Sequence, residues 1–173
     1  MKSFFRVLAV GVMAGGVGIG SVASSPSTLG AAAGGPRCFG QDATKVSNGK
    51  FVPGTSGPDV IVTRSANNSV IAAEGDDRVC LGDGRDFARG DTGNDRLDGE
   101  GGKDKLSGGS LSANEIGSGD DVLRGGGGPD ELNGHDGADV IEGGPGDDVI
   151  RGGAGTDRCE GGGGDDKVRQ CEE

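Results

Sequence analysis

Acidic and apolar residues recur together along this chain with a period of nine. The acidic positions run in steps of nine, with one gap of seventeen after residue 104: Asp59, Asn68, Asp77, Asp86, Asp95, Asp104, Asp121, Asp130, Asp139, Asp148, Asp157 and Asp166. An apolar residue follows each of them two positions later: Ile61, Val70, Val79, Ala88, Leu97, Leu106, Leu123, Leu132, Ile141, Ile150, Cys159 and Val168. Glycine lies two positions before each acidic residue, with Ala66 as the exception.

These three columns predict a repeating turn and strand. A glycine-rich segment that ends in Asp is typical of a tight turn, because glycine adopts backbone angles that other residues avoid. The next three residues form a short strand, and its middle side chain points inward because side chains alternate across a strand. Two units make one flattened coil of about eighteen residues, and successive coils stack at ~4.8 Å. We therefore predict an all-β protein, a parallel β-roll (β-solenoid) of about twelve nine-residue repeats, two per coil.

Composition alone would favour a different structure. The chain of 173 residues has 40 glycines, five Phe, no Trp and no Tyr, with a formal net charge of −11. An acidic chain with few large apolar residues is normally disordered. Disorder does not keep three columns in phase for a hundred residues, so the periodicity decides for a fold. The acidic charge argues against a nucleic-acid partner, which needs clustered Lys and Arg, and favours cations.

Stacking brings the acidic residues into register. Turns two units apart lie on the same side of the roll, so their carboxylates form a column, and like charges this close repel unless a cation lies between them. Carboxylates and turn carbonyls are hard oxygen ligands, which suit Ca²⁺ better than zinc or copper. The pairs expected to share ions are Asp77 with Asp95, Asp86 with Asp104, Asp121 with Asp139, Asp130 with Asp148, Asp139 with Asp157 and Asp148 with Asp166.

Segments such as GGPGDDVIR, GGAGTDRCE and GGGGDDKVR resemble the nonapeptide GGxGxDxUx of the RTX (hemolysin-type) calcium-binding repeat family. The resemblance covers about residues 57–169 and implies several calcium ions, held by Asp side chains and turn carbonyls of stacked turns. The metal ligands that it implies are Asp77, Asp86, Asp95, Asp104, Asp121, Asp130, Asp139, Asp148, Asp157 and Asp166, with turn carbonyls near Gly126, Gly128, Gly144, Gly146, Gly153 and Gly155. The start at residues 38–44, CFGQDAT, is also similar to small secreted actinobacterial proteins of this repeat type.

The earlier repeats depart from the consensus. The unit TRSANNSVI lacks every consensus glycine and carries Asn68 in place of Asp. Thr63, Ala72, Leu81 and Asp91 replace leading glycines, whereas four of the five units from Gly125 onward keep both. We therefore expect the C-terminal block of repeats to bind calcium more tightly than the N-terminal block.

The N-terminus has the layout of a secretory signal peptide. Lys2 and Arg6 precede an uncharged stretch over residues 7–22, and small residues follow it. A membrane anchor is the alternative, but this apolar stretch is short for a ~20-residue span and is diluted by glycine. We predict a signal peptide and spacer over residues 1–33 with cleavage near 23 or 33, a cap over 34–56, the roll over 57–169 with a register break at 111–118, and a tail over 170–173.

Four cysteines in an exported chain predict two disulfides. Cys80 and Cys159 are about four coils apart, or ~19 Å by the stacking distance. Bridged Cα atoms lie within about 7 Å, so we expect Cys38 to pair with Cys80 and Cys159 with Cys171. Free or metal-binding thiols are the alternative, and no Cys-x-x-Cys spacing favours them.

No catalytic set stands out. His135 is the only histidine, and we interpret it as an exposed turn residue because no Ser partner or orienting acid is marked in the sequence. We predict a secreted, non-enzymatic, extracellular protein with calcium as its cofactor, a structural or surface-interaction role and no membrane insertion. An accessory or remnant module of a secreted RTX-type enzyme or toxin is the alternative.

Overall fold

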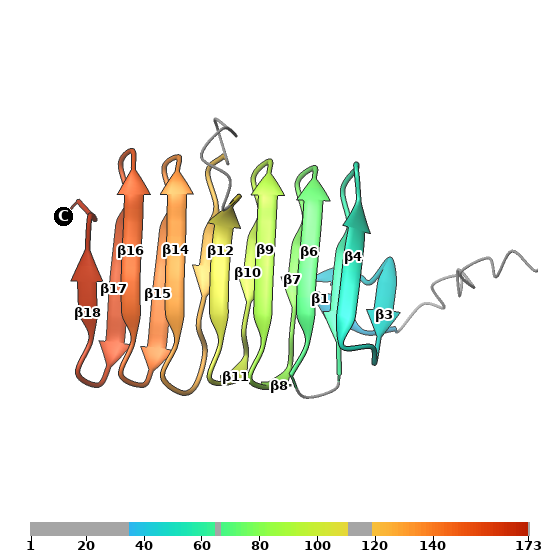
Figure 1. The fold of residues 1–173 in the computed structure, drawn as a ribbon, viewed down its shortest axis with the longest axis horizontal. Helices are drawn as coiled ribbons and strands as arrows, with labels where there is room; N and C mark the ends of the chain where they lie inside the picture. The colour runs from blue at the N-terminus through green and yellow to red at the C-terminus, as the bar shows by residue number, and fades with distance from the viewer. Residues whose placement is uncertain (1–34, 65–66, 111–118, 173) are drawn as a thin grey trace, which may run out of the picture.

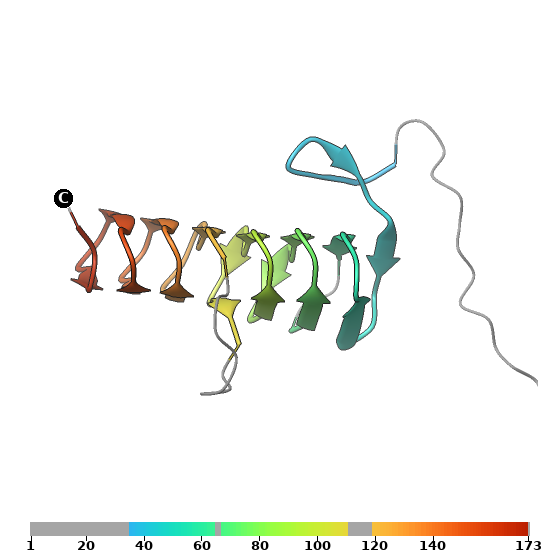
Figure 2. The ribbon, with the colours of Figure 1, turned by 90° about the horizontal axis from the view of Figure 1, so that it is seen from above.

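The structure is a computed structural model, and it describes residues 35–64, 67–110 and 119–172. The predicted signal segment and the predicted register break lie outside these residues. The strands run across the long axis of the roll and are stacked side by side along it (Figure 1), and seen from above they form two facing layers (Figure 2). The described chain thus confirms the all-β parallel roll with two repeats in each coil.

Each layer is a seven-stranded parallel sheet. The first sheet, in the order β17-β15-β13-β10-β7-β5-β3, contains β3 (Lys45–Ser47), β5 (Val60–Thr63), β7 (Arg78–Cys80), β10 (Arg96–Asp98), β13 (Val122–Arg124), β15 (Val140–Pro145) and β17 (Arg158–Gly163). The second sheet, in the order β18-β16-β14-β12-β9-β6-β4, contains β4 (Phe51–Thr55), β6 (Ser69–Glu74), β9 (Phe87–Thr92), β12 (Lys105–Gly109), β14 (Glu131–Asp136), β16 (Val149–Ala154) and β18 (Lys167–Arg169).

Two short strand pairs complete the described structure. An antiparallel hairpin joins β1 (Arg37–Cys38) to β2 (Gln41–Asp42), and β8 (Asp83–Gly84) pairs in parallel with β11 (Gly101–Gly102) at the turns. In the part of the chain that the structure describes, no helix has the length and apolar character needed to cross a membrane.

The register follows the repeat. Residues eighteen apart pair across neighbouring strands, as Val79 does with Ile61 and Ile150 with Leu132. Where residues 111–118 intervene, the offset becomes 26, and Leu123 pairs with Leu97. Both sheets therefore continue in the same register on the two sides of this segment.

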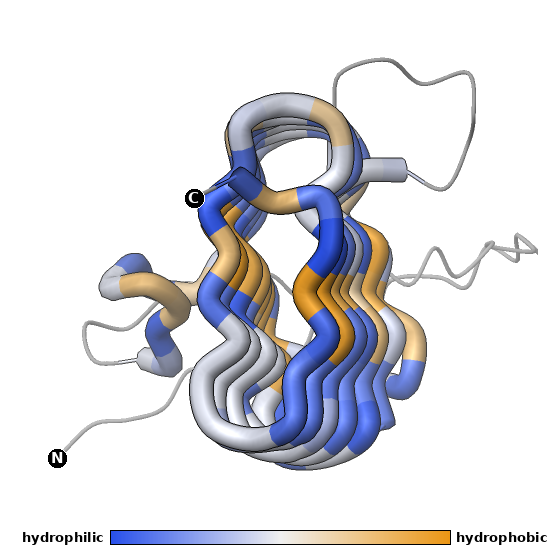
Figure 3. Tube along the Cα trace, turned by 90° about the vertical axis from the view of Figure 1, so that its left-hand side faces the viewer, coloured by the Kyte–Doolittle hydropathy of each residue, from blue (hydrophilic) through white to orange (hydrophobic). Residues whose placement is uncertain are grey.

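The core is a single ladder of apolar side chains between the two sheets. Ten of the twelve inward positions predicted from the repeat are at most 1% exposed, from Ile61 to Ile150. Figure 3 shows the hydrophobic residues at the same place in successive coils. Cys159 is only partly buried and Val168 is 42% exposed, because no further coil covers them.

Two disulfides fix the two terminal segments onto the roll, with the predicted pairing. Cys38 bonds to Cys80 with a Cα–Cα distance of 5.7 Å, and Cys159 bonds to Cys171 at 5.9 Å. The first bond fixes the β1–β2 hairpin over an apolar cluster on the outer face of the first sheet, which includes Val60 and Val62. The second bond holds the end of the chain against the last coil.

We expect a truncation in the middle of the ladder to cost far more stability than one at its end. Leu132 is fully buried, so Leu132→Ala should lower the free energy of unfolding by about 2–5 kcal/mol, the usual cost of removing these core atoms. Val168→Ala, at the exposed last position, should change it by less than ~0.5 kcal/mol, as for surface residues. Urea denaturation in calcium buffer measures both, and equal losses would contradict the single-ladder core.

Candidate metal sites in the turns

The acidic residues of the repeat form two columns, one along each edge of the roll. Column A lies in the turns that lead from the second sheet to the first, and it contains Asp59, Asp77, Asp95, Asp121, Asp139 and Asp157. Column B lies in the turns that lead from the first sheet to the second, and it contains Asn68, Asp86, Asp104, Asp130, Asp148 and Asp166. In each of the six carboxylate pairs expected from the sequence, the two residues are therefore neighbours in the same column.

From Asp77 onward, one oxygen of each column carboxylate links two coils. Oδ1 of Asp139 accepts a hydrogen bond from the backbone N–H of Asp121 at 2.8 Å, and Oδ1 of Asp148 accepts one from Asp130 at 2.8 Å. The same bond crosses the eight-residue segment, from the N–H of Asp95 to Asp121. Each later coil thus satisfies a buried backbone donor of the coil before it.

In several turns the residue before the column Asp makes a hydrogen bond in the reverse direction. A backbone N–H of the later coil donates to a side chain of the earlier coil. Asp76 accepts a hydrogen bond from the N–H of Asn94, and Asn94 in turn accepts one from Asp120. In column B, Asp147 accepts one from Asp165. Neighbouring coils are therefore joined by hydrogen bonds in both directions. The repeat pattern alone marked no role for this second set of residues.

The other carboxylate oxygen, Oδ2, is buried without a hydrogen-bond partner. This holds for eight described residues, each at most 3% exposed: Asp77, Asp86, Asp95, Asp104, Asp121, Asp130, Asp139 and Asp148. Leaving a buried charged oxygen unpaired is costly. Because the same unpaired oxygen recurs in eight turns, it indicates a common ligand of the turns rather than a local packing defect.

In six of these eight turns the first residue is glycine, and a small cradle lies between Oδ2, that glycine and the next coil. In the turns of Asp77 and Asp86, Ala72 and Leu81 take the place of this glycine. A methyl group on Gly99 would lie 2.6 Å from Oδ2 of Asp104 and 2.5 Å from the carbonyl oxygen of Gly125. A methyl group on Gly125 would lie 2.6 Å from Oδ2 of Asp130 and 2.6 Å from the carbonyl of Gly143. Two oxygens from successive coils therefore converge on one point, which only a glycine leaves open.

The glycines expected to present turn carbonyls share one backbone conformation. All six have positive φ: Gly126 at 95°, Gly128 at 120°, Gly144 at 104°, Gly146 at 156°, Gly153 at 129° and Gly155 at 138°. Gly144 lies over the carbonyl of Gly126, and Gly146 lies over that of Gly128. These carbonyls therefore point along the column, into the gap between coils.

Burial raises the pKa of the column carboxyls. The pKa of Asp121 rises from 3.8 to about 9 and that of Asp95 to about 8, mainly by loss of water and further by the charges of column neighbours. Asp77 and Asp104 reach a pKa of about 7 for the same reasons. Hydrogen bonds from the backbone oppose the shift in each case. A positive ion in the column would reverse it.

The donor set fits a hard cation. Within the described residues, no three Asp, Glu, His or Cys side chains meet at one point. An ion in the turns would therefore take its ligands from the stacked Asp carboxylates and from backbone carbonyls. An all-oxygen set of carboxylate and carbonyl is the set that Ca²⁺ prefers. The observed residues thus match the ligands implied by the sequence resemblance, and their ligation of the ion remains a prediction.

His135 is not the exposed turn residue that we expected. It is half-buried, with φ of 81°, and its Nε2 lies 2.8 Å from Oγ of Ser107 and 2.7 Å from Nδ2 of Asn133. Burial lowers the pKa of its imidazole, although nearby Asp136 opposes the shift. Ser107 lies 28 residues earlier in the chain, so only the stacking of β12 and β14 brings the two together.

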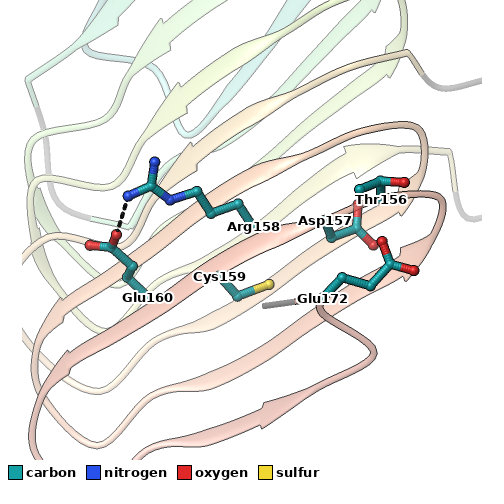
Figure 4. A pocket seen from close by; sticks show the side chains of 6 residues that line it. All are labelled: Thr156, Asp157, Arg158, Cys159, Glu160 and Glu172. Carbon is teal, nitrogen blue, oxygen red and sulfur yellow. Dashed lines mark hydrogen bonds and ion pairs between the residues drawn. The ribbon is translucent and has the colours of Figure 1, made fainter.

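The C-terminal end continues column A for part of one more coil. The carbonyl of Gln170 and Oδ2 of Asp157 meet over Gly152, as the equivalent oxygens do in the coils before. The N–H of Glu172 donates to the carbonyl of Asp157 at 2.9 Å. Figure 4 shows the carboxylates of Asp157 and Glu172 close together in a hollow at this end, next to Cys159.

Comparison with known proteins agrees with this geometry. Four stretches match the family described as RTX calcium-binding nonapeptide repeat (4 copies), at residues 53–88, 81–110, 115–149 and 134–168. No curated protein and no solved structure is detectably similar to the chain. The four stretches cover more than half of the chain, and both columns run through them. The chain therefore belongs to the RTX calcium-binding nonapeptide repeat family.

Proposed function

We propose that this protein binds several calcium ions in columns A and B, outside the cell, and that the ions hold its coils together. The observation that carries this proposal is the row of eight buried Oδ2 atoms without partners, six of which lie opposite a carbonyl of the next coil. Binding of a divalent cation at these points would compensate the buried charge and tie successive coils. The ions would then be part of the fold, as in other proteins whose metal binding is coupled to folding.

A structural or surface-interaction role fits the turns better than catalysis. The carboxylates of the columns face backbone groups of neighbouring coils and are almost fully buried. The one Ser–His contact is shielded as well, since Ser107 is 2% exposed and its hydroxyl also donates to the carbonyl of Gly109. A nucleophile must reach its substrate, and this hydroxyl lies beneath the surface.

An extracellular location is supported by the two disulfides, which persist in oxidising compartments. It is also supported by the N-terminal sequence, which has the layout of a signal peptide. Calcium is abundant outside cells, where modules with Kd values of ~10⁻⁴ to 10⁻³ M are filled.

Calcium should induce the fold. Without it, the repulsion within the columns and the entropy cost of ordering a glycine-rich chain leave most of the roll unfolded. Circular dichroism of the mature protein should show strand formation on addition of Ca²⁺, with a midpoint at about 10⁻⁴ to 10⁻³ M, and loss of strand signal on addition of EDTA. A strand-rich spectrum that EDTA leaves unchanged would refute the proposal.

Removal of one column carboxylate should weaken calcium binding, whereas removal of a nearby surface carboxylate should not. Asp139→Asn puts an amide in place of the buried Oδ2, next to neighbours Asp121 and Asp157. We expect it to weaken binding at least tenfold, about 1.4 kcal/mol. Asp120→Asn removes the same charge from an exposed position and keeps an acceptor for the N–H of Ala138. Isothermal titration should find its affinity within about twofold of the parent.

A further inference from the structure

The first turn of column A almost matches the repeat consensus but has a different structure. Residues 54–59 read Gly-Thr-Ser-Gly-Pro-Asp, so Thr55 is the one departure from GGxGxD. In later turns, the glycine two residues before Asp has positive φ, as in Gly75 at 121° and Gly93 at 123°. Gly57 occupies the same position and lies outside the positive-φ region.

In this turn the protein itself satisfies the second carboxylate oxygen. Oδ2 of Asp59 accepts hydrogen bonds from the backbone N–H of Thr55 at 2.7 Å and from its hydroxyl at 3.0 Å. Asp59 is 7% exposed, so its carboxylate is buried as the later ones are. Oδ2 of Asp59 thus has two hydrogen-bond donors, whereas the Oδ2 atoms of eight later carboxylates have no partner.

The first turn of column B is closed in a similar way. Thr63 replaces the first glycine of this turn, and its hydroxyl donates to the carbonyl of Leu81 at 2.5 Å. In column B from Gly99 onward, the equivalent carbonyl of the next coil faces the open cradle. Asn68 replaces the Asp, and its amide Nδ2 donates to the carbonyl of Gly49 at 2.9 Å. The hydroxyl of Thr63 therefore donates to the carbonyl that faces the cradle in later turns, while Asn68 provides an uncharged amide in place of a carboxylate and bonds to the segment before it.

Other contacts anchor this first coil independently of the columns. The apolar cluster with Val60 and Val62 joins it to the hairpin, and the Cys38–Cys80 disulfide ties the hairpin to β7 of the second coil. Thr44 adds two bonds to Val60, one from its N–H to the carbonyl and one from the Val60 N–H to its hydroxyl.

We infer that the first coil is closed to calcium by Thr55, Thr63 and Asn68, and that it forms an ion-independent cap on which the calcium-dependent coils stack. Hydrogen-bond donors of the chain here take the place that a cation takes later. Repeat proteins need distinct end units, because each repeat is stabilised by its neighbours. A preformed end also provides paired strands for the next coil, which lowers the entropy cost of starting the stack. The second half of the inference rests on the proposed calcium binding.

Hydrogen exchange of the full-length oxidised protein tests the cap. In EDTA, the backbone amides of β5 and of the hairpin should keep at least tenfold slower exchange than those of β13 to β18, and calcium should slow the latter group. Uniform loss of protection in EDTA would overturn the cap while leaving calcium-dependent folding intact. Uniform protection in EDTA would refute the proposed function, and the cap with it.

Calcium stoichiometry tests the closed turn. Thr55→Gly restores the full consensus over residues 54–59, removes the hydroxyl and lets the backbone reach positive φ, so equilibrium dialysis should find one more ion per chain. Thr55→Ser keeps both donors and should leave the count unchanged. Without any change at Thr55, Asp59→Asn should also leave the count unchanged, whereas Asp95→Asn should lower it. An unchanged count in Thr55→Gly, or a lower count in Asp59→Asn, would overturn the inference.

Discussion

The whole roll depends on one residue that does two things at once, the Asp at the end of each turn. Its Oδ1 accepts a backbone hydrogen bond from the coil before, so the residue cannot be replaced by an apolar one without leaving a buried donor unpaired. The same geometry fixes Oδ2 inside the turn, where its charge has lost water. Linking the coils and burying charge are therefore inseparable, and a bound cation resolves the conflict.

Much of this could be predicted from the sequence because a strict period carries three-dimensional information. The spacing of nine gave the inward position of residues such as Leu97 and Ile141, and two units per coil gave the pairing of Asp121 with Asp139. The stacking distance alone sufficed to choose the two disulfides. These predictions succeeded because each depends on the position of a residue in the repeat rather than on its particular neighbours.

The repeat pattern was uninformative where a specific side chain overrides it, and the prediction for His135 was wrong for this reason. Thr55 looks like a minor departure, and only the structure shows that its hydroxyl and N–H satisfy Asp59. His135 meets Ser107 because their strands are adjacent in the second sheet, a contact of 28 residues' separation that no local motif marks. The links made by Asp76 were missed since an acidic residue next to a metal-ligand position looks like a simple solvated turn.

The change of offset from 18 to 26 between Leu97 and Leu123 has a consequence for how such a protein can vary. Both sheets and both columns resume unchanged after eight additional residues, because each coil takes its alignment only from the coils beside it. Gene duplication can therefore lengthen the roll by whole coils, and new sequence can enter at an edge without disturbing the coils on either side. The edge between β12 and β13 is a natural place for this chain to acquire a recognition segment while its scaffold stays the same.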